Sequence, residues 1–300
     1  MDYFFELLAG GLTRGSIYAL IALGYTMVYG IIQLINFAHG EVYMIGAFVA
    51  LIVSGVLTIY GFSGVSILVL AALIAVIYAA AYGYTLERIA YRPLRNAPRL
   101  APLISAIGMS LFLQNYVMLS QTPDYLPFPA LIPQFGFMEP IEHIVSSADL
   151  VILVTTVLTM VGLTLLIKYT KVGKSMRATQ QDMTMARLVG INVDRVISMT
   201  FIIGSVLAAI GGVLIGSKLG QINFYIGFMA GIKAFTAAVL GGIGNIPGAV
   251  LGALVLGLSE SFAAGYISSA YEDVFAFAIL VLILILRPAG LLGKAAKQKV

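Results

Sequence analysis

Residues 197–218 read ISMTFIIGSVLAAIGGVLIGSK, an apolar stretch whose only charge, Lys218, stands at its end. The hydrocarbon core of a bilayer is about 30 Å thick, and a helix crosses it with about 20 apolar residues. The stretch is therefore predicted to be a membrane-spanning helix. Gly212, Gly216 and Gly220 recur at every fourth position. This spacing places them on one helix face, where a second backbone can approach closely.

The whole composition agrees with a membrane protein. Of the 300 residues, 60% are hydrophobic and only 10% are charged, and the mean hydropathy is +1.02. A soluble domain carries about 25% charged residues, because its surface faces water. The chain has no cysteine, which excludes disulfides, thiol catalysis and cysteine-ligated metal sites.

The hydropathy pattern predicts eight or nine spans in one all-α domain over residues 1–300. The seventh span is short and is followed by a glycine-rich stretch with Pro247, which predicts a broken or re-entrant helix near 228–248. The predicted spans are 9–30, 41–60, 64–86, 101–120, 150–169, 197–218, 228–242, 247–265 and 270–287.

The basic residues give the spans a direction. Loops rich in Lys and Arg stay on the cytoplasmic side, and most of the 17 basic residues lie in three clusters. These clusters are Arg88, Arg92, Arg95 and Arg99; Lys168, Lys171, Lys174, Arg177, Arg187 and Arg195; and Arg287, Lys294, Lys297 and Lys299. We therefore expect all three clusters to be cytoplasmic. The net charge of +4 then needs no nucleic-acid partner.

Two stretches are predicted to lie outside the bilayer. Residues 121–149 contain acids and prolines but no Lys or Arg, so we expect an ordered external loop. Whether this loop is a partner surface or only a stiff connection stays open. Residues 171–195 form the longest predicted cytoplasmic segment. Met183, Ala186, Leu188 and Val189 give it an apolar side that is suited to docking another protein.

No motif predicts catalysis, and no metal or cofactor is predicted. Gly173-Lys174-Ser175 resembles the end of a phosphate-binding loop, but Lys168 stands where that motif requires glycine. Gly242-Ile243-Gly244 begins like a dinucleotide fingerprint, yet Pro247 replaces its third glycine. The chain is therefore not expected to bind nucleotide or to be an enzyme.

Polar residues within the apolar blocks are the better functional signal, because lipid makes them costly. Asn36, His39 and Glu41 lie between the first two spans. They either line a permeation path or order a broken helix, or else they are hydrated in a surface loop. Lys233 and Glu260 are isolated charges in the last third, and they are further candidates for the permeation path or a helix break. Snorkelling of Lys233 to the interface is the preferred interpretation, and pairing with Glu260 is the alternative.

A second set of glycines, Gly244, Gly248 and Gly252, repeats the four-residue spacing. We expect it, like Gly212, Gly216 and Gly220, to be a helix-packing face with no ligand role.

Several motifs closely resemble the permeases of ABC importers for branched-chain amino acids, and specifically the shorter of the two permease types. They occur in family order over nearly the whole chain: GYTMVYG at 24–30, INFAHGE at 35–41, MIGA at 44–47, YRPLR at 91–95, GKSMRA at 173–178, ARLVGI at 186–191 and LGGIGNIPGA at 240–249.

The resemblance implies a bacterial inner-membrane importer with several subunits. A second permease, two ATP-binding subunits and a periplasmic substrate-binding protein are the implied partners, and leucine, isoleucine and valine are the implied substrates. The resemblance also implies a coupling helix near 179–191, with Asp182, Ala186, Arg187 and Gly190 facing the ATPase. Thr184 and Met185 depart from the Glu-Ala pair of the common coupling motif.

Other functions remain open at this point. Permeases for other amino acids or amides share much of the pattern. An ion-coupled secondary transporter is a different class, which usually shows intramembrane acids and repeated halves. Glu41 and Glu260 are the candidate acids, and no clear repeat is present.

Overall fold

The computed structural model describes residues 2–95, 97–98, 100–142, 144–287 and 289–293, and it confirms an all-α bundle. Four of the predicted cytoplasmic cations, Arg99, Lys294, Lys297 and Lys299, lie outside the described residues. The helices are α1 (Asp2–Ile32), α2 (His39–Ile59), α3 (Val65–Leu86), α4 (Leu100–Ser120), α5 (Ser147–Tyr169), α6 (Lys171–Gln181), α7 (Met183–Leu188), α8 (Val193–Leu219), α9 (Ile226–Gly241), α10 (Ile246–Tyr266) and α11 (Glu272–Leu286).

Within the described residues, eight helical segments are long and apolar enough to cross a membrane. Helix α9 is a shorter apolar helix of 16 residues, which is about 24 Å at 1.5 Å per residue. The prediction of eight or nine spans is therefore confirmed. A turn at 242–245 separates α9 from α10, and the two helices then pack against each other.

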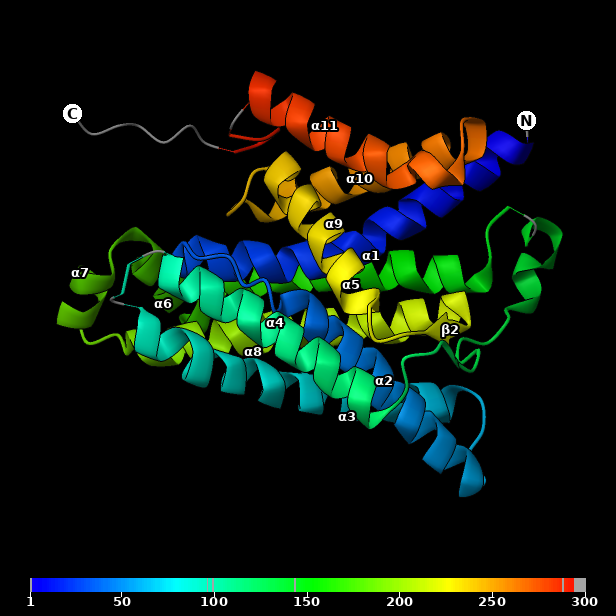
Figure 1. Ribbon diagram of the computed structural model, residues 1–300, viewed down its shortest axis with the longest axis horizontal. Coiled ribbons are helices and arrows are strands. Elements are labelled where there is room, and N and C mark those ends of the chain that lie inside the picture. Colours follow the sequence, from blue (N-terminus) through cyan, green and yellow to red (C-terminus); the bar gives the residue numbers. More distant parts are fainter. Residues whose placement is uncertain (1, 96, 99, 143, 288, 294–300) are drawn as a thin grey trace.

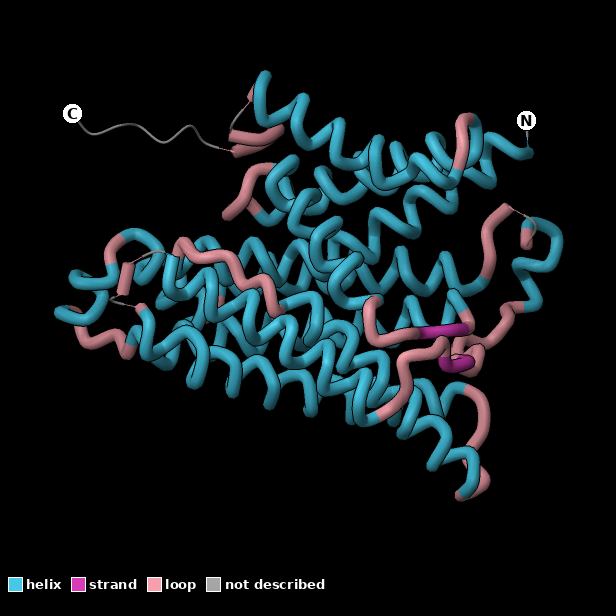
Figure 2. Tube along the Cα trace, in the orientation of Figure 1, coloured by secondary structure: helices cyan, strands magenta, loops and turns pink. Residues whose placement is uncertain are grey.

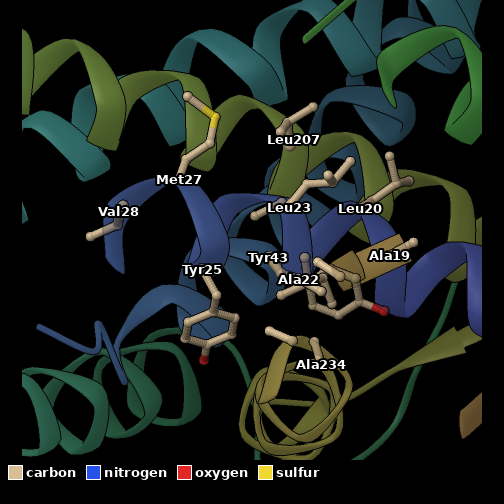
Figure 3. Packing of buried hydrophobic residues seen from close by; sticks show 14 of the residues in the cluster. Ala19, Leu20, Ala22, Leu23, Tyr25, Met27, Val28, Tyr43, Leu207 and Ala234 are labelled. Carbon is tan, nitrogen blue, oxygen red and sulfur yellow. The ribbon is translucent and has the colours of Figure 1, made fainter. Parts of the chain in front are cut away.

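Helix α1 is the centre of the bundle. It packs against α5, α8, α9 and α10, and most of its residues are buried. Figure 3 shows its side chains between Leu207 of α8 and Ala234 of α9. Helices α3, α4, α5 and α11 are peripheral, with large apolar side chains facing outward, such as Ile77, Leu158 and Ile285. This arrangement suits a bundle surrounded by lipid.

The two ends of the bundle differ in charge. One end, here called the basic end, holds α6, α7 and the α3–α4 connection with a π-helical turn (Glu87–Tyr91) and a 3₁₀ turn (Arg92–Leu94); Figure 1 shows it at the left. The opposite, acidic end holds the 121–146 loop and the start of α11, with Glu272 and Asp273. Figures 1 and 2 thus place the predicted inner and outer segments at opposite ends.

The 121–146 loop is ordered by packing onto the end of α8. Its strand β1 (Leu126–Pro127) pairs antiparallel with β2 (Gln221–Ile222), and a 3₁₀ turn (Gly136–Ile141) follows. The backbone N–H groups of Leu131 and Ile132 donate to Ser217 Oγ at 2.9 and 3.2 Å. These bonds confirm that the loop is ordered, whether or not it serves a partner.

The two glycine series are only partly packing faces. A Cβ on Gly212 would overlap the backbone of Tyr43 in α2, and Gly248 and Gly252 face the backbone of α9 equally closely. These three are packing glycines, as predicted. The prediction is wrong for the other three. Gly216 faces the ring of Phe128 from the loop, and Gly220 (φ +68°) and Gly244 (φ +91°) supply left-handed turns with open space around them.

Candidate functional site

A helix break lies inside the bundle, between α1 and α2. Helix α1 ends at Ile32, Gln33 adopts a positive φ of 53°, and α2 begins only at His39. Figure 1 shows α2 beginning near the middle of the bundle. Asn36, His39 and Glu41 are all buried. The interpretation of a hydrated surface loop is therefore wrong, because the chain turns back into the protein before α2 begins.

Close helix packing forms this region. A Cβ on Gly40 would overlap the carbonyl oxygen of Gly227, and one on Gly24 would overlap the His39 ring. The His39 ring packs on the edge of Tyr25, with ring centroids 4.9 Å apart. Asn36 Oδ1 accepts a hydrogen bond of 2.9 Å from the Tyr91 hydroxyl. Glycines thus allow α1, α2 and α9 to enclose polar side chains.

Glu41 is the exceptional residue of the break. Its side chain is fully buried in the first turn of α2. Oε1 accepts a hydrogen bond of 2.9 Å from Ser110 Oγ of α4, whereas Oε2 has no hydrogen-bond partner. Among the described residues, no cation lies within ion-pair distance of Glu41. The positive end of the helix dipole partly compensates the charge.

A small cavity adjoins Ser110. It holds about 60 Å³ and is bordered by α1, α4 and α9 together with the helix break. Apart from Ser110 and the Tyr25 ring, its lining is apolar or glycine: Phe37, Ile107, Leu111, Phe228, Gly231 and Ile232. Ile107 and Leu111 are also exposed on the outer face of α4. The cavity thus lies between a buried carboxylate and the side of the bundle.

The other intramembrane acid has counter-ions. Lys233 Nζ lies 3.3 Å from Glu260 Oε1, 3.2 Å from Glu272 Oε1 and 2.7 Å from Asp273 Oδ1. The Tyr18 hydroxyl donates to Glu260 Oε2 at 2.7 Å. Lys233 is buried, and its ammonium group also reaches Glu272 and Asp273 in the first turn of α11. The structure shows the alternative pairing with Glu260, and snorkelling to the interface stays a prediction.

At the basic end, α6 is fixed rigidly to α5. Thr170 ends α5 and caps α6, accepting from the N–H of Gly173 at 3.0 Å. Arg177 of α6 donates to the carbonyl oxygens of Ile167 and Lys168, the last turn of α5. A Cβ on Gly173 would overlap the α5 backbone. The two helices therefore meet at a tight, hydrogen-bonded corner.

The predicted coupling helix is broken in two at Asp182. Its side chain caps α7 by accepting from the N–H groups of Thr184 (2.7 Å) and Met185 (3.0 Å). Ala186 is buried, and Gly190 ends the segment at φ +85°. The predicted apolar side is divided in the same way: Met183 and Ala186 turn inward, whereas Leu188 and Val189 are 76% and 74% exposed.

Comparison of the sequence with known proteins identifies the family. A family model described as "Branched-chain amino acid transport system / permease component" matches residues 7–284. The chain belongs to this permease family.

Individual relatives match the permease over its whole length. The high-affinity branched-chain amino acid transport system permease protein LivH of Escherichia coli is 50% identical, with 99% of this chain and 98% of the relative covered. The corresponding protein BraD of Pseudomonas aeruginosa is 52% identical with the same coverage. A probable LivH from Methanocaldococcus jannaschii is 28% identical over 96% of this chain and 92% of the relative. No solved structure matches.

The permease also contains a charged cluster that we did not predict. Glu87 is fully buried and accepts from Arg92 at 3.2 and 2.9 Å, and it also pairs with Arg95. Ser198 of α8 donates to Glu87 Oε2 at 2.8 Å. The cluster joins the α3–α4 connection to the start of α8. Its only sequence signal was an acid directly before a run of arginines.

Proposed function

We propose that this permease is one of two membrane-spanning subunits of an ATP-driven importer for leucine, isoleucine and valine in the bacterial inner membrane. The observation that carries this proposal is the identity of about half of all positions, over the full length, with relatives named as branched-chain amino acid permeases. Substrate class follows from these names, and an importer for another amino acid is the alternative that an uptake assay distinguishes.

The proposed energy source is a pair of separate ATP-binding subunits, and the proposed substrate source is a periplasmic binding protein. The charge difference between the two ends supports this arrangement, because positive loops stay in the cytoplasm. Residues 1–300 then form a single permease domain, with 171–195 facing the ATPases and 121–149 facing the binding protein.

Helix α7 is the proposed contact with an ATPase. Met185, Leu188 and Val189 expose apolar side chains at the basic end, and exposed apolar residues on a short helix suit insertion into a partner's groove. Arg187 is exposed beside them and available to an acidic partner. The shape of the segment depends on three other residues. Asp182 caps α7, Ala186 is buried against the bundle, and Gly190 provides the turn that ends the segment.

In the proposed mechanism, closure of the ATPases moves α6 and α7 and shifts the spans attached to them. The path between the two permeases then opens alternately to each side, and ATP biases the equilibrium by binding one state more tightly. Asn36, His39 and Glu41 lie at the helix break, the kind of place where transporters hold substrate. Lys233 and Glu260, which pair with each other, are assigned to holding helices together.

The decisive test replaces Leu188 with Glu in the complete importer, reconstituted in proteoliposomes with its binding protein. Burying an unpaired charge in the interface costs several kcal/mol, so ATPase co-purification and leucine uptake are expected to fall at least about tenfold. Membrane insertion stays intact, because Leu188 is exposed.

The matched control is Thr184→Glu, which adds the same charge to the same helix at a position where the common coupling motif carries Glu. It is expected to retain uptake. Normal ATPase binding by Leu188→Glu would contradict docking at α7. Absence of leucine uptake by the unmodified importer would contradict the proposed substrate.

A further inference from the structure

Glu41 is the one buried carboxylate of the described chain that lacks a cation. The other three buried acids all have one: Asp149 pairs with Lys218, Glu87 with two arginines and Glu260 with Lys233. An unpaired carboxylate is expensive inside a membrane protein. Among these four acids, Glu41 is thus the one whose carboxylate remains free to receive an external cation.

The surroundings of Glu41 define which cation fits. Its free oxygen, Oε2, lies against Gly227 of α9, and its other oxygen is bonded to Ser110. Ser110 also borders the cavity beside α4. The cavity offers three aromatic rings, from Tyr25, Phe37 and Phe228, and the aliphatic side chains of Ile107, Leu111 and Ile232. A carboxylate beside an apolar cavity wall is suited to a ligand that carries an ammonium group on an aliphatic chain.

We infer that Glu41 and Ser110 form a transient site for the α-ammonium group of the transported aliphatic amino acid, whose side chain rests on the apolar cavity wall. This inference rests on the proposed function and names the substrate group that the helix break receives. A metal ion fits less well, because hard cations take six or more oxygen ligands, whereas the side chains here offer one carboxylate and the hydroxyls of Ser110 and Tyr25.

The cavity is too small to hold a whole amino acid in this state, since ligand pockets usually measure about 300 Å³ or more. Its outer wall is α4, a peripheral helix with Ile107 and Leu111 exposed on its outer face. An outward shift of the α4 wall enlarges the cavity beside Ser110 and Glu41. The site is thus closed in this structure and accessible during the transport cycle, which suits a carrier that must bind weakly.

The test is leucine uptake by the reconstituted importer carrying Glu41→Gln. Glutamine keeps the size and the acceptor for Ser110 but loses the charge. A hydrogen bond to a charged group contributes about 1.5–3 kcal/mol, so uptake is expected to fall about tenfold or more. ATPase stimulation by the loaded binding protein stays near the unmodified level, because Glu41 is buried in the first turn of α2, whereas α7 lies at the basic end. Glu41→Asp, which keeps the charge, is expected to recover part of the uptake.

Glu6→Gln is the matched control, since it removes a carboxylate from the exposed start of α1. Normal uptake by Glu41→Gln would overturn the inference while leaving the proposed function intact. If Glu41→Gln fails to assemble, Ser110→Ala decides instead: a drop of several-fold supports the site, and unchanged uptake overturns it. An unmodified importer that takes up no leucine would refute the proposed function itself.

Discussion

The permease buries two intramembrane carboxylates, Glu41 and Glu260, in opposite electrostatic surroundings. Glu260 accepts from Tyr18 and faces Lys233, which is shared with Glu272 and Asp273. Glu41 has a single hydrogen bond and no cation among the described residues. The first arrangement ties α1, α9, α10 and α11 together, and the second leaves a charge uncompensated. The buried charge of Glu260 therefore holds helices together, whereas that of Glu41, by our proposal, takes part in transport.

The largest expected effect comes from removing the cation of the compensated cluster. Lys233→Met leaves Glu260 and Asp273 buried or half-buried without their counter-ion, because Arg14 reaches only Glu272 in this cluster. Breaking a buried pair from one side costs about 3–5 kcal/mol. We expect a loss of that size in the free energy of unfolding, measured by denaturant titration in detergent.

The control adds Glu260→Gln to Lys233→Met. Because the second change removes the stranded charge, the double variant is expected to recover part of the lost stability, and the two changes are not additive. Strictly additive losses would show that Lys233 and Glu260 do not act as a pair.

A smaller loss is expected for Glu87→Gln at the basic end. Glu87 is buried, but Arg92 remains partly exposed and regains water when the pair is broken. The expected loss is about 2 kcal/mol in the same assay. Asp194→Asn, which removes an exposed partner of Arg95, is the control and is expected to cost only about 0.5 kcal/mol. Equal losses for the two would mean that burial does not decide the strength of these pairs.

Among the three buried charged residues compared, the smallest effect on stability is expected for Glu41→Gln. The amide retains an acceptor for Ser110 and removes an uncompensated charge, so the free energy of unfolding stays within about 1 kcal/mol of the unmodified value. A loss comparable with that of Lys233→Met would contradict the comparison, because it would mean that Glu41 has a stabilising partner. Glu41→Gln is thus expected to change uptake strongly and stability little, whereas Lys233→Met is expected to change stability strongly.

The sequence was sufficient for the helices and for the separation of basic from acidic segments, because hydropathy and clustered charge act over short stretches. Thus α8 lies within a few residues of its prediction, and the basic and acidic segments occupy opposite ends. It was sufficient also for naming Asn36, His39 and Glu41 as unusual, since polar residues stand out in apolar blocks.

The partners of the charges were not predictable in the same way. Arg14, Lys218 and Lys233 stand outside the basic clusters, and each pairs with an acid on another helix. Such pairs join residues far apart in the chain, so only the helix packing brings them together. For the same reason the glycine spacing alone did not distinguish the packing glycine Gly212 from the turn glycine Gly220.

The corner between α5 and α6 has a mechanical consequence. Gly173, Thr170 and Arg177 leave no slack between the two helices, and α5 in turn touches α1 where Thr156 Oγ1 donates to Ser16 O at 3.2 Å. In the proposed mechanism, a displacement of α6 is therefore passed directly to α5, because only Thr170 separates the two helices and hydrogen bonds hold the corner. In this mechanism, the end of α5 then moves with α6, and the contact at Thr156 passes the displacement to α1.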